Sequence, residues 1–168
     1  AAEQRAGVGL ATLVRPAWKP VAGDNWQTAP TAVSAALAIG KEARKVFLAL
    51  GRQELHCFAA IAQHHYVVRL IDPPQGGRPH NLVVLQQRGP FDFDAEMRLL
   101  KERKIDVIVS RNWGGTATYA KIEAGRVLRL PVIMITRPVK PTGHIVRTAE
   151  EAVAWLAHAG PAPSLRGV

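Results

Sequence analysis

The stretch SRNWGGTATYAK, residues 110–121, places groups that bind anions directly after an apolar run, DVIVS. Gly114 and Gly115 let the backbone approach a ligand closely, so that N–H groups can donate to phosphate oxygens. Arg111 adds a guanidinium suited to phosphate or carboxylate. Thr116 can cap a following helix, whose N-terminus favours negative charge. The motif alone leaves two interpretations open, an anion site and an ordinary capped turn.

A second loop with similar composition follows the apolar run VFLAL. Gly51 is expected to let the backbone turn tightly, and Arg52 brings a guanidinium to the carboxyl end of the strand. Neither loop has the GxxxxGK[ST] or GxGxxG spacing of the common phosphate-binding motifs. Two such loops nevertheless strengthen the anion-site interpretation, because ligands of open α/β sheets bind at the carboxyl ends of strands. The candidate ligand contacts are Gly51, Arg52, Gln53, Ser110, Arg111, Asn112, Gly114, Gly115, Thr116, Thr118 and Lys121.

Short, continuous and β-branched apolar runs alternate with helical patterns along the chain. This pattern is typical of a parallel sheet covered on both faces, so the fold class predicted is α/β, a Rossmann-like open parallel sheet with helices on both faces. Strands are expected at 9–14, 46–50, 66–71, 82–85, 107–109 and 132–135. Helices are expected at 31–42, 53–62, 93–104 with Asp92 or Asp94 as N-cap, 116–128, and 148–158 with a capping box from Thr148 to Glu151.

The first residues read as the end of a helix whose beginning is not in the sequence, which predicts that the chain is the C-terminal part of a longer protein. Two prolines, a Gly-Asp pair, Trp18 and Trp26 then suggest an interdomain linker with aromatic anchors, which are expected to pack rather than to stack on a ligand. The predicted organisation is a remnant of an N-terminal domain plus linker at 1–28 and a C-terminal α/β domain at 29–168.

The formal net charge of +9 favours anionic partners such as phosphates, polycarboxylates or nucleic acid. The basic residues are scattered, without the concentrated arm of a typical nucleic-acid binder. Neither a membrane span nor a signal peptide is visible, and the single Cys57 fits a reducing, cytoplasmic location. His56, Cys57, His64 and His65 match no zinc spacing, so Cys57 is expected in the core, the two adjacent histidines on a solvated turn, and no metal site.

Several motifs in one order resemble a known family: VFLALGRQEL, IDPP, RGPFDFDAE, IDVIVSRNWGGTATYAKIEAGRVLRLPVIMITRP and TAEEAVAWL. RPAWKP and GDNW, near the start, extend the resemblance over nearly the whole chain. The sequence resembles the precorrin-6A reductase family of cobalamin biosynthesis, whose cobalt-precorrin counterpart is closely related. The family often has Lys and Ser where Arg111 and Trp113 stand here; Arg111 preserves the charge, whereas Trp113 could offer a stacking face in place of a hydrogen bond.

The resemblance implies a two-domain α/β oxidoreductase that uses NADPH to reduce precorrin-6A to precorrin-6B, with both ligands in a cleft between the domains. The candidate ligand contacts above then become contacts to NADPH, and Arg15 and Arg137 become candidates for substrate carboxylates. No catalytic nucleophile or general acid is evident, because the hydride comes from the nicotinamide. The alternative is a non-catalytic nucleotide- or nucleic-acid-binding module with a basic surface. The oligomeric state stays open.

Overall fold

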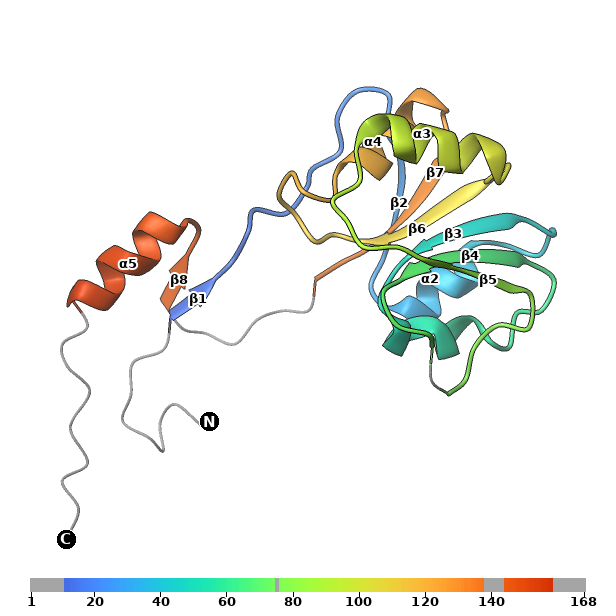
Figure 1. Cartoon of the computed structure of the whole chain (residues 1–168), viewed down its shortest axis with the longest axis horizontal. Coiled ribbons are helices and arrows are strands. Elements are labelled where there is room, and N and C mark those ends of the chain that lie inside the picture. The colour runs from blue at the N-terminus through green and yellow to red at the C-terminus, as the bar shows by residue number, and fades with distance from the viewer. Residues whose placement is uncertain (1–10, 75, 138–143, 159–168) are drawn as a thin grey trace, which may run out of the picture. The chain divides into compact units, whose positions relative to one another are not determined.

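The computed structural model describes residues 11–74, 76–137 and 144–158 of the chain (Figure 1). Contacts divide the chain into two compact units, one formed by residues 1–16 together with 139–168 and the other by residues 17–138. Each unit has its own sheet. They are therefore described separately.

The larger unit is built on a six-stranded sheet in the order β2-β7-β6-β3-β4-β5, and all its strand pairs are parallel. Central strand β3 is followed along the chain by β4 and β5 on one side and by β6 and β7 on the other. The strands are β2 (Asn25–Ala29), β3 (Lys45–Ala49), β4 (His65–Leu70), β5 (Leu82–Gln86), β6 (Val107–Arg111) and β7 (Pro131–Ile135).

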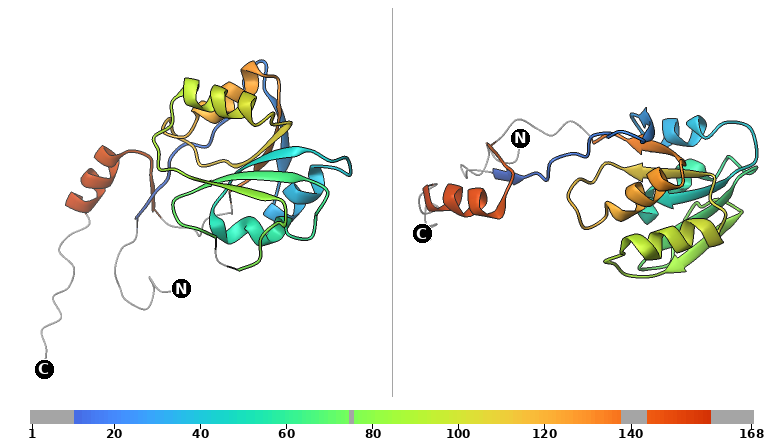
Figure 2. Two further views of the ribbon diagram at one scale, coloured as in Figure 1. Left: turned by 45° about the vertical axis from the view of Figure 1, so that its right-hand side comes forward. Right: turned by 90° about the horizontal axis from the view of Figure 1, so that it is seen from above.

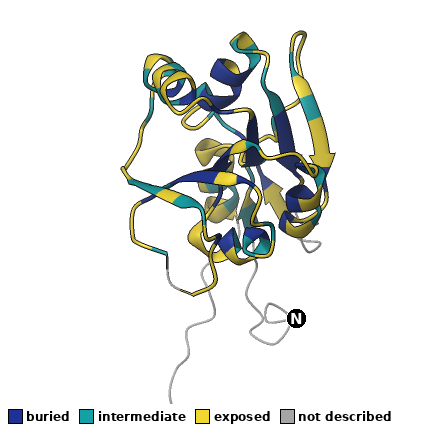
Figure 3. Cartoon of the chain, turned by 90° about the vertical axis from the view of Figure 1, so that its right-hand side faces the viewer, coloured by how far each residue is buried: buried dark blue, intermediate teal, exposed yellow. Residues whose placement is uncertain are grey.

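Helices cover both faces of this sheet, as Figure 2 shows. Helix α2 (Ala32–Ala38) and the 3-10 helix η1 (Arg52–Phe58) pack on one face, and α3 (Phe93–Glu102) and α4 (Ala120–Val127) on the other. The buried residues gather in the central strands (Figure 3), which explains why these strands lack polar alternation. The predicted fold class is confirmed.

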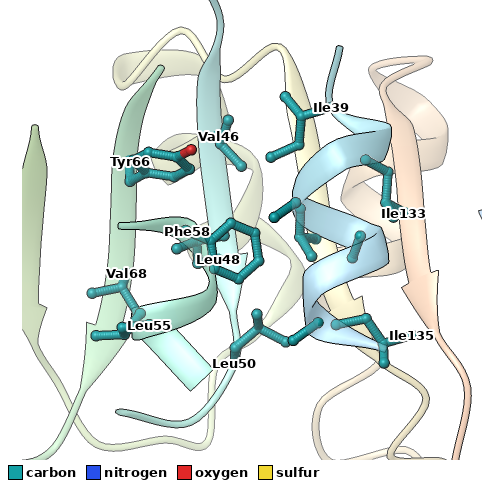
Figure 4. Packing of buried hydrophobic residues seen from close by; sticks show 14 of the residues in the cluster. Ile39, Val46, Leu48, Leu50, Leu55, Phe58, Tyr66, Val68, Ile133 and Ile135 are labelled. Atoms are coloured by element: carbon teal, nitrogen blue, oxygen red, sulfur yellow. The ribbon is translucent and has the colours of Figure 1, made fainter. Parts of the chain in front are cut away.

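The core on the α2 side is made of large side chains from several elements (Figure 4). Leu55 and Phe58 of η1 are both fully buried against strand residues such as Leu48 and Tyr66. Burying a side chain of this size contributes about 1.5–3 kcal/mol. This packing fixes η1, and hence the loop after β3, against the sheet.

Local capping interactions explain where two helices begin. The Thr31 hydroxyl accepts from the Ser34 amide and the Ser34 hydroxyl accepts from the Thr31 amide, a reciprocal capping box. Asp92 accepts from the Ala95 amide at 2.7 Å, which confirms one of the two predicted caps of α3. Thr148 likewise accepts from the Glu151 amide before α5 (Ala149–His158).

The smaller unit contains a parallel pair, β1 (Ala11–Leu13) and β8 (His144–Val146), followed by α5. Val146 is buried, whereas Leu13, Ile145, Val153 and Leu156 are each at least half exposed. Strand β8 is not predictable from the sequence pattern, because three residues are too few to show a period.

Four details expected from the sequence differ in the structure. Residues 25–28, expected in a linker, belong to edge strand β2 (Asn25–Ala29), so the sheet begins upstream of the boundary expected near Thr28. The assignment of 1–28 to another domain stays a prediction. The segment 53–62 is mostly a 3-10 helix, and α4 begins at Ala120 rather than at Thr116. His64 is buried, not solvated, with Nδ1 accepting from the Arg44 amide.

Candidate functional site at the carboxyl ends of β3 and β6

The loops after β3 and β6 are neighbours in space, because Ala49 pairs with Ser110 in the sheet. The chain order reverses between these two strands, since β3 continues to β4 on one side and β6 lies on the other. A reversal of this kind opens a crevice at the carboxyl ends of the strands, where open α/β sheets bind ligands. The two loops singled out in the sequence therefore meet at the expected place for a site.

The loop after β6 presents a run of free amide groups. Gly114 and Gly115 have φ values of 68° and 72°, a conformation that side chains with a Cβ rarely adopt. In the part of the chain that the structure describes, the N–H groups from Gly114 to Thr118 donate to no protein acceptor. Thr116 caps no helix; its carbonyl accepts from Tyr119 in a turn that precedes α4. The loop can thus offer several N–H donors to an anion.

Trp18 holds this loop from the N-terminal side. The Asn112 side chain accepts from the Trp18 amide at 2.8 Å and donates to the Trp18 carbonyl at 2.9 Å. The indole Nε1 of Trp18 donates to the Gly115 carbonyl at 2.7 Å, and its ring packs 5.6 Å from that of Tyr119. Trp18 therefore packs, as expected, whereas the Asn112 amide is engaged with the backbone rather than open to a ligand.

Arg111 joins the two loops through an ion pair. Its Nε lies 2.9 Å and 3.0 Å from the two carboxylate oxygens of Glu54 on η1. Hydrogen bonding to Glu54 raises the pKa of the guanidinium. The bidentate face predicted for phosphate is thus occupied by Glu54, and Arg111 fixes the distance between the loops.

A cavity of about 290 Å³ lies where the loops meet. Gly51, Thr118 and Lys121, three of the predicted contacts, line it together with Trp113, whose side chain is half exposed. The remaining lining residues are Phe47, Ala49, Leu50, Arg69, Phe91 and Glu96. An apolar cavity with a few polar groups is the usual form of a small-molecule site.

Arg137 lies beside a second cavity, of about 250 Å³, lined also by Arg111, Asn112, Trp113 and Thr136. Its Nε donates to the Asn112 carbonyl at 2.5 Å and its Nη2 to the Trp113 carbonyl. The guanidinium thus supports the backbone of the loop after β6. Its predicted role toward a substrate carboxylate stays a prediction, as does that of Arg15, which is exposed in the smaller unit.

The structure changes the expected geometry of Gly51 and Ser110, whereas the ligand contacts expected of Arg52 and Gln53 stay predictions. Gly51 has φ −78°, which any residue adopts, so it is not required for a tight turn. Ser110 is fully buried with its hydroxyl donating to the Arg111 carbonyl, so a ligand cannot reach it in this structure. Arg52 is exposed and lies 3.9 Å from Asp72. Gln53 is exposed, and its carbonyl is within hydrogen-bonding distance of His56 Nδ1.

Sequence reasoning missed a buried charge cluster next to the cavity, formed by Arg69, Glu96 and Lys121. Arg69 Nη1 lies 2.7 Å from Glu96 Oε1, and burial lowers the pKa of Lys121 to about 8, partly offset by the Glu96 charge. The sequence did contain one sign of this cluster, because an arginine within the buried strand HYVVRL requires a partner of opposite charge.

The fold and site place this chain in the Rossmann-like class of α/β proteins with a ligand crevice at the strand reversal. The model of the family described as "Precorrin-6x reductase CbiJ/CobK" matches residues 1–157. The chain belongs to this family.

Two curated relatives and one solved structure are also similar to this chain. A precorrin-6A reductase of Rhodobacter capsulatus is 41% identical over all of this chain and 66% of the relative, and one of Sinorhizobium sp is 44% identical over 94% of this chain and 60% of the relative. The chain thus spans 60–66% of the length of these relatives. The solved "CobK precorrin-6A reductase" superposes with a TM-score of 0.91 at 40% identity, covering 99% of this chain and 68% of that one.

Two classes of feature are absent from the described residues. Within 11–74, 76–137 and 144–158, no three His, Cys, Asp or Glu side chains gather in a way that could hold a metal ion. No helix in these ranges is long and apolar enough to cross a membrane.

Proposed function

We propose that this chain carries part of the machinery for NADPH-dependent reduction of precorrin-6A to precorrin-6B in cobalamin biosynthesis. Relatives at 41% and 44% identity bear the name precorrin-6A reductase. One structural observation carries the assignment of a site: Gly51, Thr118 and Lys121, from two separate loops, line a single cavity at the strand reversal. The net charge of +9 suits two anionic ligands.

The loop after β6 fits the phosphates of a dinucleotide. Its free N–H groups from Gly115 to Thr118 would donate to phosphate oxygens, and the missing side chain of Gly115 leaves that backbone bare. Trp18 and Asn112 hold the loop in shape before any ligand arrives, which reduces the ordering cost of binding.

Trp113 fits a planar ring. Its indole is half exposed and lines both cavities, so a nicotinamide or a tetrapyrrole could stack on either side of it. NADPH, when bound, supplies the hydride. The protein's part is to orient the two rings and to keep water away from them, for which the apolar lining of Phe47, Leu50 and Phe91 is suited.

A titration of this chain with NADPH and then with NADH tests the proposal, with tryptophan fluorescence and nicotinamide emission as readouts. We expect saturable binding that favours NADPH. Replacing Gly115 by Leu should block the loop amides and weaken binding about tenfold or more. Gly40→Leu, at an exposed left-handed glycine that lines neither cavity, should leave the affinity nearly unchanged.

Oxidation of NADPH by precorrin-6A is the second measurement, on the same preparation. Equal NADPH affinity in the Gly115→Leu chain, checked by circular dichroism to be folded, would remove the loop from the cofactor site. Steep salt dependence with no preference between nucleotides would instead support a non-catalytic, charge-driven binding module.

A further inference from the structure

We propose that Lys121 and Arg69, which line the 290 Å³ cavity together with Glu96, form a seat for one oxyanion, either a phosphate or a carboxylate. The seat is separate from the amide donors of the glycine loop and brings in two residues, Arg69 and Glu96, that no sequence motif indicates. The choice of its natural ligand rests on the proposed function; the existence of the seat does not.

Lys121 supplies the first donor. The residue is 7% exposed, yet it lines the cavity. Nζ donates to the Thr118 carbonyl at 2.6 Å and lies 5.3 Å from the centroid of the Trp18 ring. An ammonium carries three N–H donors, and among the described residues only Thr118 accepts from it. Two donors are thus left for a ligand.

Arg69 supplies the second donor. Nη1 and Nη2 lie 2.7 Å and 3.4 Å from the Glu96 carboxylate oxygens, and the guanidinium carbon sits 3.6 Å from the centroid of Phe91 and 5.5 Å from that of Phe47. The side chain is 10% exposed, and its buried Nε has no partner among the described atoms. A buried donor without an acceptor is costly, so the cluster is short of acceptors on the Arg69 side.

The charges facing the cavity leave one positive charge uncompensated. Lys121 on α4 and Arg69 on β4 are cationic, Glu96 on α3 is anionic, and the other seven lining residues are uncharged. Desolvation is the main cause that lowers the pKa of Lys121 to about 8, and the Arg69 charge lowers it further against the opposing effect of Glu96. A bound oxyanion would supply the missing charge and raise that pKa.

Two ligand groups share this chemistry, and the experiment separates them. The chain is labelled with ¹³C-lysine, and the Lys121 signal, identified by its loss in Lys121→Met, is followed against pH. One series contains inorganic phosphate, a second NADP⁺ and a third a small tricarboxylate as probe for a carboxylate-rich substrate. We expect at least one probe to raise the Lys121 pKa, and its affinity to fall as pH rises above about 8, because the neutral amine no longer attracts an anion.

Variants supply the controls. Lys121→Met should weaken the active probe about tenfold or more, and Lys121→Arg, which keeps the charge, should restore part of the loss. Lys101→Met, on the exposed side of α3, removes the same net charge and should leave the affinity unchanged. A response to phosphate and NADP⁺ alone assigns the seat to the cofactor, and a response to the tricarboxylate alone assigns it to the substrate.

The proposal is overturned if no probe moves the Lys121 titration, or if Lys121→Met and Lys101→Met weaken binding equally. The measurement on the unsubstituted chain decides this even if Lys121→Met folds poorly. Binding of phosphate at Lys121 without any affinity for NADPH would leave the seat in place and count against the proposed function instead.

Discussion

The loops after β3 and β6 look alike in sequence, with a glycine followed by polar residues after an apolar strand, yet their backbones differ. Gly51 has an ordinary extended conformation with open space where a Cβ would stand. Gly114 and Gly115 are left-handed, and Gly114 is buried. The first loop continues into η1, and the second stays irregular for eight residues before α4. The φ angle decides whether a position requires glycine, and the sequence does not reveal that angle.

The two loops also differ in what holds them. The β3 loop is held by the packing of Leu55 and Phe58 against the sheet, which is a non-directional apolar contact. The β6 loop is held by directed hydrogen bonds to Trp18 and from Arg137. We therefore expect the β6 loop to be the more sensitive of the two to single substitutions.

The largest effect is expected for Gly114→Val. A β-branched residue at φ 68° is strained, so the free energy of unfolding should fall by about 2–3 kcal/mol. Gly51→Val, the matched change in the other loop, should alter it by less than about 0.5 kcal/mol. Urea unfolding of both variants measures the difference, and equal losses would remove the contrast between the loops.

A smaller effect is expected for Asn112→Ala. The change removes an acceptor and a donor from the backbone of Trp18, at a cost of about 1–3 kcal/mol. The Trp18 environment should loosen as well, which a shift in tryptophan emission would report. An unchanged unfolding midpoint would show that Trp18 does not depend on this pair.

Next comes Arg111→Lys, which keeps the charge but loses the two-pronged contact to Glu54. The pair is partly exposed, so solvent screening limits the loss to about 1 kcal/mol. Glu54→Gln should cost a similar amount, and a double substitution should cost less than the sum of the two if the pair is a real link. Additive losses in thermal unfolding would show that the two loops are not joined here.

The smallest effect is expected for Arg52→Ala. Its contact with Asp72 spans 3.9 Å and both side chains are about half exposed or more, so the free energy of unfolding should change by less than about 0.5 kcal/mol. A loss above 1 kcal/mol in urea unfolding would mean that the β3 loop is held by charge rather than by packing.

The sequence predicted the helices and strands that have a clear apolar pattern. It did not predict elements that form only through pairing with a distant segment, or loops whose conformation depends on backbone angles. Strand β3 and helix α3 were anticipated from apolar runs and from Asp92 as cap. Strand β2 was missed because its burial pattern is mostly exposed, and it forms only by pairing with β7 far along the chain. Long-range pairing of this kind leaves little local trace.

The candidate site divides in the same way. The sequence placed both loops at the carboxyl ends of strands, because residue types after apolar strands are local information; that the two strands are neighbours is seen only in the structure. It could not show that Arg111 is already paired with Glu54, 57 positions away, or that Ser110 is enclosed by the core. It also gave no account of Arg69 and Glu96, whose association spans 27 positions.

The contacts of Trp18 have a consequence for hydrogen exchange. Its amide, carbonyl and indole N–H are all bound to the β6 loop, through Asn112 and Gly115. If residues 17–20 move as one piece, these three hydrogen bonds open together. The Trp18 amide and indole protons should then exchange with solvent at a common rate. A ligand that steadies the loop would slow both protons at once, and the indole of Trp18 would report occupancy of a site that it does not touch.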